Sequence, residues 1–257
     1  MNLIDTHAHL TFDEFQGDLA EVLDRSRGVG VNRWITIGTD PEHNRKAVEL
    51  AGKHEDIFAA VGFHPHYAAD ITKEDFKVLR RLLTATRIVA VGEIGLDFHY
   101  NFSKQDAQDH VFREQLAIAA DAALPVVVHS RNAFDQVVDI LDEFAPSLKN
   151  VVFHCYSGTA EQTRMLLQRG WHISFTGIVT FRKSDDTRAA ASQTPLDYMM
   201  IETDCPYISP EPVRNQRPCE PAMLVHTARK IAELHQVPID DFAATVTAAS
   251  EKFFALP

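Results

Sequence analysis

The chain has 257 residues, a formal net charge of −11 and a hydrophobic fraction of 45%. This composition is typical of a globular protein, and the length suits one large domain as well as two small ones. The acidic balance argues against a broad nucleic-acid-binding surface, because binding to a polyanion normally needs a basic footprint. It does not exclude a phosphodiester substrate that is attracted by metal ions and a few local basic side chains.

Cysteine content and hydropathy indicate the compartment. The three cysteines, Cys155, Cys205 and Cys219, have no C-x-x-C spacing, and an odd number does not suggest a disulfide framework. No apolar stretch approaches the roughly 18 residues that a membrane span needs, and the N-terminus lacks the pattern of an export signal. We therefore expect a cytoplasmic protein without a membrane partner.

Short apolar runs alternate with longer segments of helical periodicity along the whole chain. The runs predict strands at residues 3–6, 33–37, 57–61, 88–92, 125–128, 150–153, 172–175 and 198–202, and the longer segments predict helices such as 18–29, 42–54, 106–123, 133–144 and 161–169. Thr72, Ser103 and Thr159 begin sequences of capping-box form or a near variant. Asp40-Pro41 offers an N-cap followed by proline, and Gly170 is expected at a helix end.

About eight strands and about seven helices, with no flexible linker, predict a parallel sheet with crossover helices. The strand count favours a single-domain (β/α)₈ barrel, the TIM barrel, over residues 1–257. The alternative is a doubly wound open sheet. It is disfavoured because no glycine-rich nucleotide-binding loop follows the first strand.

Residues that can bind metals follow most of the predicted strands. They are His7 and His9 after the first strand, His64 after the third, Glu93 after the fourth, His129 after the fifth, His154 after the sixth and Asp204 after the eighth. In a barrel the C-terminal ends of the strands meet at one rim, where active sites are built. A single histidine at such a position is more often a packing residue, and Asp204 alone is a reasonable N-cap. The set as a whole predicts an active site.

The chemistry of this set favours a catalytic metal centre. His7 and His9 are two residues apart on a strand, so both imidazoles point to the same side. Imidazole nitrogen and carboxylate oxygen without thiolate suit Zn, Mg, Mn, Ni or Fe. One ion needs only three or four protein ligands. The six candidate ligands therefore predict two divalent ions per chain, bridged by Glu93, and they are His7, His9, Glu93, His129, His154 and Asp204. Such a pair would activate a water molecule for hydrolysis.

Seven motifs carry a resemblance to a known family. They are Ile4-Asp-Thr-His-Ala-His9, Gly62-Phe-His-Pro65, Val91-Gly-Glu-Ile-Gly-Leu-Asp97, Val128-His-Ser-Arg131, His154-Cys-Tyr-Ser-Gly158, Ser174-Phe-Thr-Gly-Ile178 and Ile201-Glu-Thr-Asp-Cys-Pro-Tyr207. The sequence resembles the TatD family of metal-dependent deoxyribonucleases, within the amidohydrolase-like barrel superfamily. The likeness runs almost from end to end.

The resemblance implies roles for the site residues. One ion would be held by His7, His9, Glu93 and Asp204, and the other by Glu93, His129 and His154. Asp204 would also orient or deprotonate the attacking water, and His64 would contact the substrate phosphate or a metal-bound water. The implied activity is hydrolysis of phosphodiester bonds in DNA, as a 3′-5′ exonuclease. One departure is Cys219, which stands where the family commonly has asparagine, so we expect specificity to differ if that asparagine positions substrate.

Residues around the predicted site are candidates for contacts to the substrate. His64, Arg131, Arg182 and Arg217, with Lys183, are placed to meet phosphate oxygens, although solvated charge is the simpler reading for each arginine or lysine. Tyr156, Phe181 and Tyr207 are candidates for stacking on a base, against local packing as the alternative. Asp97 and Glu202 are candidate partners of ligand histidines or of arginines.

Two other functions compete with a nuclease. The same pair of metals would serve an amidase, lactonase or ester hydrolase acting on a carbonyl substrate, and the acidic charge gives this alternative some weight. A catalytically silent scaffold is disfavoured because every expected ligand is present. The sequence leaves open the native metal, the physiological substrate and the choice between exonuclease and endonuclease. A monomer is the expectation for the oligomeric state.

Overall fold

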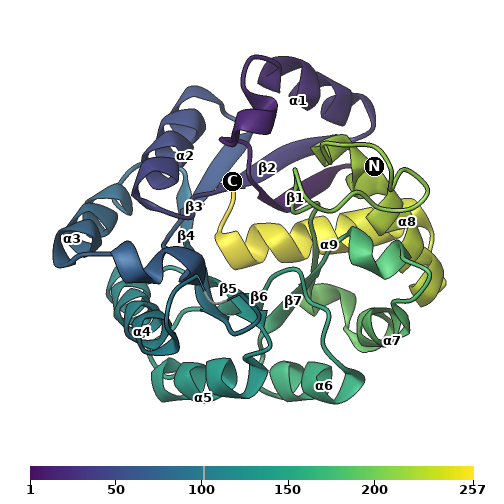
Figure 1. Ribbon diagram of the computed structural model, residues 1–257. Coiled ribbons are helices and arrows are strands. Elements are labelled where there is room, and N and C mark those ends of the chain that lie inside the picture. The colour runs from purple at the N-terminus through teal and green to yellow at the C-terminus, as the bar shows by residue number, and fades with distance from the viewer. Residues whose placement is uncertain (101) are drawn as a thin grey trace. The chain divides into compact units, whose positions relative to one another are not determined.

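The computed structural model describes residues 1–100 and 102–257, in which strands alternate with helices along the chain (Figure 1). The strands are β1 (Leu3–Ala8), β2 (Val31–Ile37), β3 (Ile57–Val61), β4 (Ile88–Asp97), β5 (Val126–Arg131), β6 (Val151–Phe153), β7 (His172–Phe175) and β8 (Met199–Ile201). The α-helices are α1 (Leu19–Gly28), α2 (Pro41–Lys53), α3 (Lys73–Leu82), α4 (Gln105–Ala122), α5 (Phe134–Phe144), α6 (Ala160–Gln168), α7 (Asp185–Gln193), α8 (Leu224–His235) and α9 (Ile239–Phe254). Short 3₁₀ helices are η1 (Asp13–Phe15), η2 (Pro65–Asp70), η3 (Gly177–Thr180), η4 (Leu196–Tyr198) and η5 (Pro221–Met223).

The eight strands are parallel and alternate with helices, so the predicted (β/α)₈ fold class is confirmed. The chain also divides into two compact units. The N/C unit comprises residues 1–36 and 155–257, and the middle unit comprises residues 37–154. The organisation of residues 1–257 as one domain stays a prediction.

The N/C unit joins the two ends of the chain through strand pairing. β1 pairs with β2 and β7 pairs with β8, both in parallel, and an isolated bridge links Ala8 to Cys205 beyond the end of β8. Helix α9 packs on β1 and β8, and its Thr247 hydroxyl donates to the carbonyl of Asn2 at the start of β1. This helix therefore lies near the starts of the strands and leaves their C-terminal ends to the loops.

The middle unit contains the parallel strands β3 to β6. β4 pairs with β3 on one side and β5 on the other, and β5 pairs with β6. Every residue of β4 is buried, including the carboxylates Glu93 and Asp97. A parallel strand between two neighbours is covered on both faces, so its apolar residues supply the core and its polar ones need partners. The unit therefore concentrates buried charge on its central strand.

Most of the local signals in the sequence act as predicted. Thr72 and Thr159 form capping boxes on α3 and α6, and the Asp40 side chain caps α2. Gly170 adopts a φ of 73° after α6. The capping-box prediction at Ser103 is wrong, because its hydroxyl donates to a loop carbonyl and the N-cap residue of α4 is Lys104.

Three strands extend further at their C-terminal ends than predicted. β1 continues to Ala8, β4 to Asp97 and β5 to Arg131. The predicted strands ended just before His7, Glu93 and His129, whereas the observed strands continue through all three residues. Within the described residues, no helix is both long enough and apolar enough to cross a membrane.

Candidate metal centre

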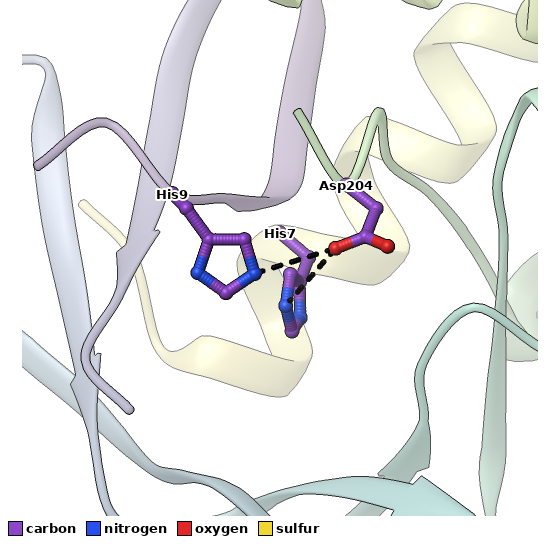
Figure 2. A group of neighbouring side chains, drawn as sticks. All are labelled: His7, His9 and Asp204. Carbon is purple, nitrogen blue, oxygen red and sulfur yellow. Dashed lines mark ion pairs between the residues drawn. The ribbon is translucent and has the colours of Figure 1, made fainter. Parts of the chain in front are cut away.

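The first cluster lies in the N/C unit and consists of His7, His9 and Asp204 (Figure 2). His7 belongs to β1, and His9 follows it after the bridge residue Ala8. The backbone N–H of Asp204 donates to the carbonyl of His7 at 3.0 Å, and that of His9 donates to the carbonyl of Cys205 at 2.9 Å. The loop after β8 is thus tied to the end of β1, so the carboxylate comes beside both imidazoles.

The backbone of Asp204 is in the left-handed region, with a φ of 53°. Aspartate tolerates this conformation better than most residues other than glycine. The turn reverses the chain directly after β8, and Tyr207 N–H donates back to the Asp204 carbonyl at 3.0 Å. The conformation therefore serves to aim one carboxylate at two histidines.

The spacing of the donor atoms in this first cluster fits a divalent ion. Asp204 Oδ1 lies 3.7 Å from His7 Nε2 and 3.4 Å from His9 Nε2. Two atoms bound about 2.1 Å from one tetrahedral ion would lie about 3.4 Å apart. His9 Nδ1 is buried and has no hydrogen-bond partner among the described residues. These nitrogen and oxygen donors suit a catalytic metal ion.

Two buried carboxylates support the first cluster. Asp5 accepts hydrogen bonds from the backbone and the hydroxyl of Thr203, at 2.9 and 2.5 Å. Burial raises the pKa of Asp5 to about 7, against the lowering effect of these bonds. Glu202 accepts from Cys155 N–H at 2.6 Å and from the Ser174 hydroxyl at 2.5 Å. Glu202 therefore ties Cys155 to Ser174 of β7 within the N/C unit.

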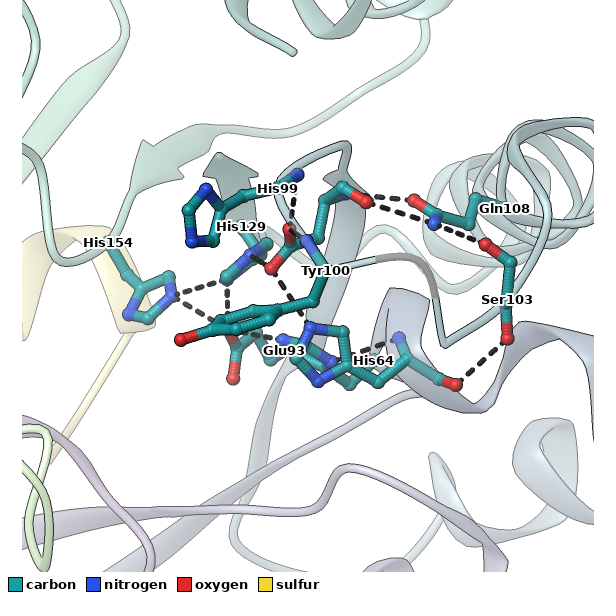
Figure 3. Close-up of polar contacts among 10 residues, drawn as sticks. His64, Glu93, His99, Tyr100, Ser103, Gln108, His129 and His154 are labelled. Carbon is teal, nitrogen blue, oxygen red and sulfur yellow. Dashed lines mark hydrogen bonds and ion pairs between the residues drawn. The ribbon is translucent and has the colours of Figure 1, made fainter. Parts of the chain in front are cut away.

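The second cluster lies in the middle unit and centres on Glu93 (Figure 3). Glu93 Oε1 is 2.8 Å from His129 Nδ1 and 2.7 Å from His154 Nε2, and it is 3.4 Å from His64 Nε2. His129 Nδ1 and His154 Nε2 are 3.4 Å apart. These residues come from β4, from β5 and from the positions after β6 and β3. One carboxylate oxygen thus gathers three imidazoles.

The titration of this cluster follows from burial and mutual charge. Burial alone would raise the pKa of Glu93, but His154, His64 and His129 hold it well below its usual range. Burial lowers the pKa of His64 to about 4, so this imidazole is neutral near pH 7. Burial also acts to lower the pKa of His129, but hydrogen bonds to Asp97 and Glu93 raise it overall. The cluster therefore keeps an ionised carboxylate among imidazoles.

Asp97 contacts the ring nitrogen of His129 that does not face Glu93. Its Oδ2 is 3.1 Å from His129 Nε2 and 2.9 Å from His66 Nε2, while its Oδ1 accepts from the backbone N–H groups of His99 and Tyr100. Burial would raise the pKa of Asp97, but these bonds lower it. A carboxylate behind a ligand histidine fixes the ring and its tautomer. Asp97 thus contacts the candidate ligand His129, and its role as a partner that orients a ligand histidine stays a prediction. His66 was missed because it lies one residue beyond the His64-Pro65 motif.

Three buried amides hold the strand ends that carry the second cluster. Asn44 donates to the Gly62 carbonyl and accepts from its N–H, and Gln115 does the same for Phe63. Gln108 accepts from Asp97 N–H and donates to its carbonyl. Backbone groups past the end of a ladder need partners when they are buried. Helices α2 and α4 provide these partners.

Gly95 allows β4 to approach β5 closely beside His129. Its φ is 142°, and a Cβ atom there would lie 2.0 Å from the carbonyl oxygen of His129. A side chain at this position would therefore displace the strand that carries His129. This geometry explains why the Gly-Glu-Ile-Gly motif is glycine-rich.

The candidate substrate contacts are spread over both units. Arg131 is exposed in the middle unit, and Arg182 and Arg217 are exposed in the N/C unit. Arg217 Nη1 donates to the carbonyls of Arg214 and Gln216. Their contacts to a substrate stay predictions.

The aromatic candidates differ in exposure. Tyr156 is buried and donates to the carbonyl of Thr159, so it has no open face for a base. Phe181 has the Arg214 guanidinium 3.8 Å from its ring centroid. Tyr207 is exposed, and its ring centroid lies 5.7 Å from that of His9. Of the three, Tyr207 best fits the prediction of a stacking residue.

Cys219, the departure from the family pattern, is fully buried, and its thiol donates to the carbonyl of Ile208 at 3.3 Å. Its effect on specificity stays a prediction, as does the sharing of Glu93 between two ions.

Sequence comparison assigns the family. The sequence model of the TatD-related DNases matches residues 4–255. The chain belongs to the TatD family. A relative from Bacillus subtilis named as the uncharacterized metal-dependent hydrolase YabD is 36% identical over 99% of both chains. The 3′-5′ ssDNA/RNA exonuclease TatD of Erwinia amylovora is 34% identical over 99% of this chain and 100% of its own.

Structural comparison agrees with this assignment. The crystal structure of YJJV, a TatD homologue from Escherichia coli, superposes with a TM-score of 0.94 at 29% identity, over 99% of this chain and 98% of that one. The predicted resemblance is therefore confirmed, and the buried histidine and carboxylate clusters fit metal binding in this TatD-family chain.

Proposed function

We propose that this TatD-family chain is a metal-dependent exonuclease that removes nucleotides from the 3′ end of single-stranded nucleic acid. The observation that carries the proposal is the pair of buried clusters of histidine and carboxylate at strand ends. The names of the relatives support the reaction, since the Erwinia amylovora protein is a 3′-5′ ssDNA/RNA exonuclease. The proposal includes a monomer that acts in the cytoplasm.

In this proposal each cluster holds one divalent ion. His7, His9 and Asp204 bind the first, and Glu93, His129 and His154 bind the second. Their nitrogen and oxygen donors suit Zn, Mn, Mg, Ni or Fe. Bound divalent ions supply charge stabilisation for a phosphodiester and a more acidic water.

The protein residues then handle the proton and the substrate. Asp204 accepts the proton of the attacking water, because its carboxylate lies beside the imidazoles of His7 and His9 in the first cluster. His64 Nδ1 accepts from the backbone N–H of His66 at 3.1 Å, so the proton of the neutral ring lies on Nε2. That N–H lies 3.4 Å from Glu93 Oε1, and in the proposal it is shared with a phosphate oxygen of the substrate.

The basic residues complete the proposed substrate contacts. Arg131, Arg182 and Arg217 supply guanidinium groups for phosphates along the strand. The net charge of −11 means that these local groups act against a repulsive overall field. The affinity for nucleic acid should therefore fall steeply as salt rises.

The deciding experiment uses protein stripped of metal and then reloaded with Mg, Mn or Zn. The substrates are single-stranded DNA and RNA with a 5′ label, so that shortening from the 3′ end gives a ladder. We expect metal-dependent laddering that disappears in Asp204→Asn. Two bound ions without cleavage of either polymer would overturn the nuclease and favour a carbonyl substrate, which a panel of lactones and amides would then identify. Absence of bound metal under all conditions would overturn the proposal as a whole.

A further inference from the structure

An exposed pair of aromatic rings stands in the middle unit, outside the metal cluster. Phe102 is 69% exposed and Tyr100 is 40% exposed. Their rings are stacked, with centroids 5.6 Å apart and planes inclined by 14°. Two large aromatic side chains held parallel in solvent do not contribute to the core. Their arrangement instead offers a binding surface for a ligand with a flat apolar face.

The pair is extended and supported by its neighbours. The Arg131 guanidinium lies 4.6 Å from the Tyr100 ring centroid, and the His66 ring contacts both aromatics edge to face. The planar cation, Tyr100 and Phe102 thus form a run of flat groups, with Phe102 as the most exposed member. Guanidinium–aromatic stacking of this kind also recurs where proteins bind single-stranded nucleic acid.

Hydrogen bonds anchor His99, Tyr100 and Ser103, which carry or lie next to the two rings in the sequence. Before them, the N–H groups of His99 and Tyr100 donate to Asp97 Oδ1, each at 2.9 Å. After them, the Ser103 hydroxyl donates to the carbonyl of His66 and accepts from Ala69 N–H. Residues next to both rings are therefore anchored, which lowers the entropic cost of ordering the rings when a ligand binds.

The same carboxylate connects the rings to the metal cluster. Asp97 Oδ2 contacts the candidate ligand His129, while Asp97 Oδ1 accepts from the backbone N–H of Tyr100. The His66 ring is near both residues, with its centroid 6.3 Å from that of His129 and 5.6 Å from that of Tyr100. A base stacked on the pair would thus sit beside the proposed reacting phosphate.

We propose that Tyr100 and Phe102 form a subsite that stacks a base of the single-stranded substrate, with Arg131 completing the platform. The inference rests on the proposed function and names the part of the substrate that this surface recognises. Stacking tolerates every base, because all bases present a π-face. An exonuclease that advances through any sequence needs this tolerance, whereas hydrogen-bond readout would stop it at some bases.

The test compares two single-stranded oligonucleotides that differ in their last three positions. One carries normal bases, and the other carries abasic tetrahydrofuran residues with the same phosphates. The variants are Phe102→Leu and Tyr100→Leu. Tyr198→Leu is the matched control, because Tyr198 is a 37% exposed aromatic just before β8, far along the strand from the loop ends. Thermal melting checks that each variant is folded.

We expect Phe102→Leu to raise KM for the normal oligonucleotide about tenfold or more, with kcat changed much less. On the abasic oligonucleotide the same variant should match wild type, and Tyr198→Leu should match wild type on both. Equal losses on both substrates, or no loss on either, would overturn the subsite. Failure of the wild type to cleave either oligonucleotide with any metal would instead overturn the proposed function and the subsite with it.

A binding measurement gives an independent readout. An oligonucleotide with 2-aminopurine at its 3′ end is titrated with metal-free wild type, and stacking should quench the fluorescence. The quench should be lost in Phe102→Leu and kept in Tyr198→Leu. A quench that survives in both Phe102→Leu and Tyr100→Leu would overturn the inference, and would leave the rings as a contact surface for another protein.

Discussion

The two clusters use the same donor types but are organised by different parts of the chain. In the N/C unit the backbone positions the carboxylate, since Asp204 N–H bonds to the His7 carbonyl and its φ of 53° turns the side chain inward. In the middle unit the carboxylate itself does the gathering, with Glu93 Oε1 within 2.8 Å of both His129 and His154. The first arrangement is set by the main chain and the second by charge.

This difference predicts unequal responses to mutation. Removing the charge of Asp204 leaves the loop and the two histidines where the backbone puts them. Removing the charge of Glu93 leaves buried imidazoles without the acceptor that orients them, which is costly in a low-dielectric interior. The clusters should therefore fail in different ways.

The largest effect is expected for Glu93→Gln. The neutral amide no longer neutralises a cation, and only one of its two terminal atoms accepts hydrogen bonds, so kcat/KM should fall on the order of 10³-fold or more. Metal bound by the middle unit should be lost as well, measured by elemental mass spectrometry alongside activity. Glu161→Gln, an exposed glutamate in the first turn of α6, is the control. A Glu93→Gln enzyme that keeps both activity and metal content would contradict the charge-centred view of this cluster.

A somewhat smaller loss is expected for Asp204→Asn. We expect kcat to fall roughly 10²- to 10³-fold, because a proton acceptor and one ligand are removed together. The ion of the middle unit should remain, so metal content should drop by about half rather than vanish. Asp186→Asn, on the exposed first turn of α7, serves as control. Complete loss of metal in Asp204→Asn would show that the two clusters do not respond separately.

A third variant, Asp97→Asn, affects the second cluster indirectly, because Asp97 contacts the candidate ligand His129. Loss of the charge behind His129 should weaken metal binding about 10- to 100-fold. Saturating metal should restore most of the activity, which distinguishes a positioning residue from a ligand. The metal concentration that gives half-maximal activity is the measured quantity. If that concentration is unchanged, the orientation of His129 does not depend on Asp97.

The smallest effect concerns a histidine outside both clusters. Burial lowers the pKa of His172 to about 4, with a further contribution from Lys252. The unfolded chain, with a pKa near 6.5, binds more protons between these values, so the free energy of unfolding falls as the pH drops below about 6.5. His172 should therefore account for about 1 kcal/mol of the stability lost between pH 7 and pH 5.5.

The variant His172→Phe tests this, because phenylalanine fits beside Tyr198 and Phe253 without a titrating group. Its free energy of unfolding, measured with urea in metal-free protein, should depend less on pH than that of wild type. Parallel pH profiles would mean that the acid sensitivity lies elsewhere, including in the clusters. The result thus separates the titration of His172 from any pH dependence that arises in the two clusters.

Much of the fold and the candidate clusters could be predicted from sequence because periodicity is a local property. Apolar runs gave strands close to those observed, and histidines at strand ends predicted ligands that the structure brings together, such as His7 with His9 and Glu93 with His129. The predicted β4 strand was too short because it ended before the polar residue Glu93. Glu93 can be buried in the strand only because it has partners that are distant in sequence.

The supporting residues could not be predicted in the same way. Nothing in the sequence near His66 or Phe102 marks them, since their roles arise from contacts to Asp97, Tyr100 and His129. Ser103 carries a correct capping sequence, yet its hydroxyl is used by the neighbouring loop. Tertiary hydrogen bonds of this kind override local propensity without leaving a periodic signal.

The buried amides of the middle unit bear on how freely its parts can be exchanged. Asn44 and Gln115 each occupy a helix, but each satisfies both backbone groups of a residue just beyond β3. A transplanted helix with an ideal amphipathic pattern would place an aliphatic or charged residue there, and the strand end would lose its donor and its acceptor at once. A grafted α2 or α4 from another scaffold would thus have the right shape but would lack the amide that bonds the end of β3. In this protein the interchangeable module is β3 together with α2 and α4, not one helix alone.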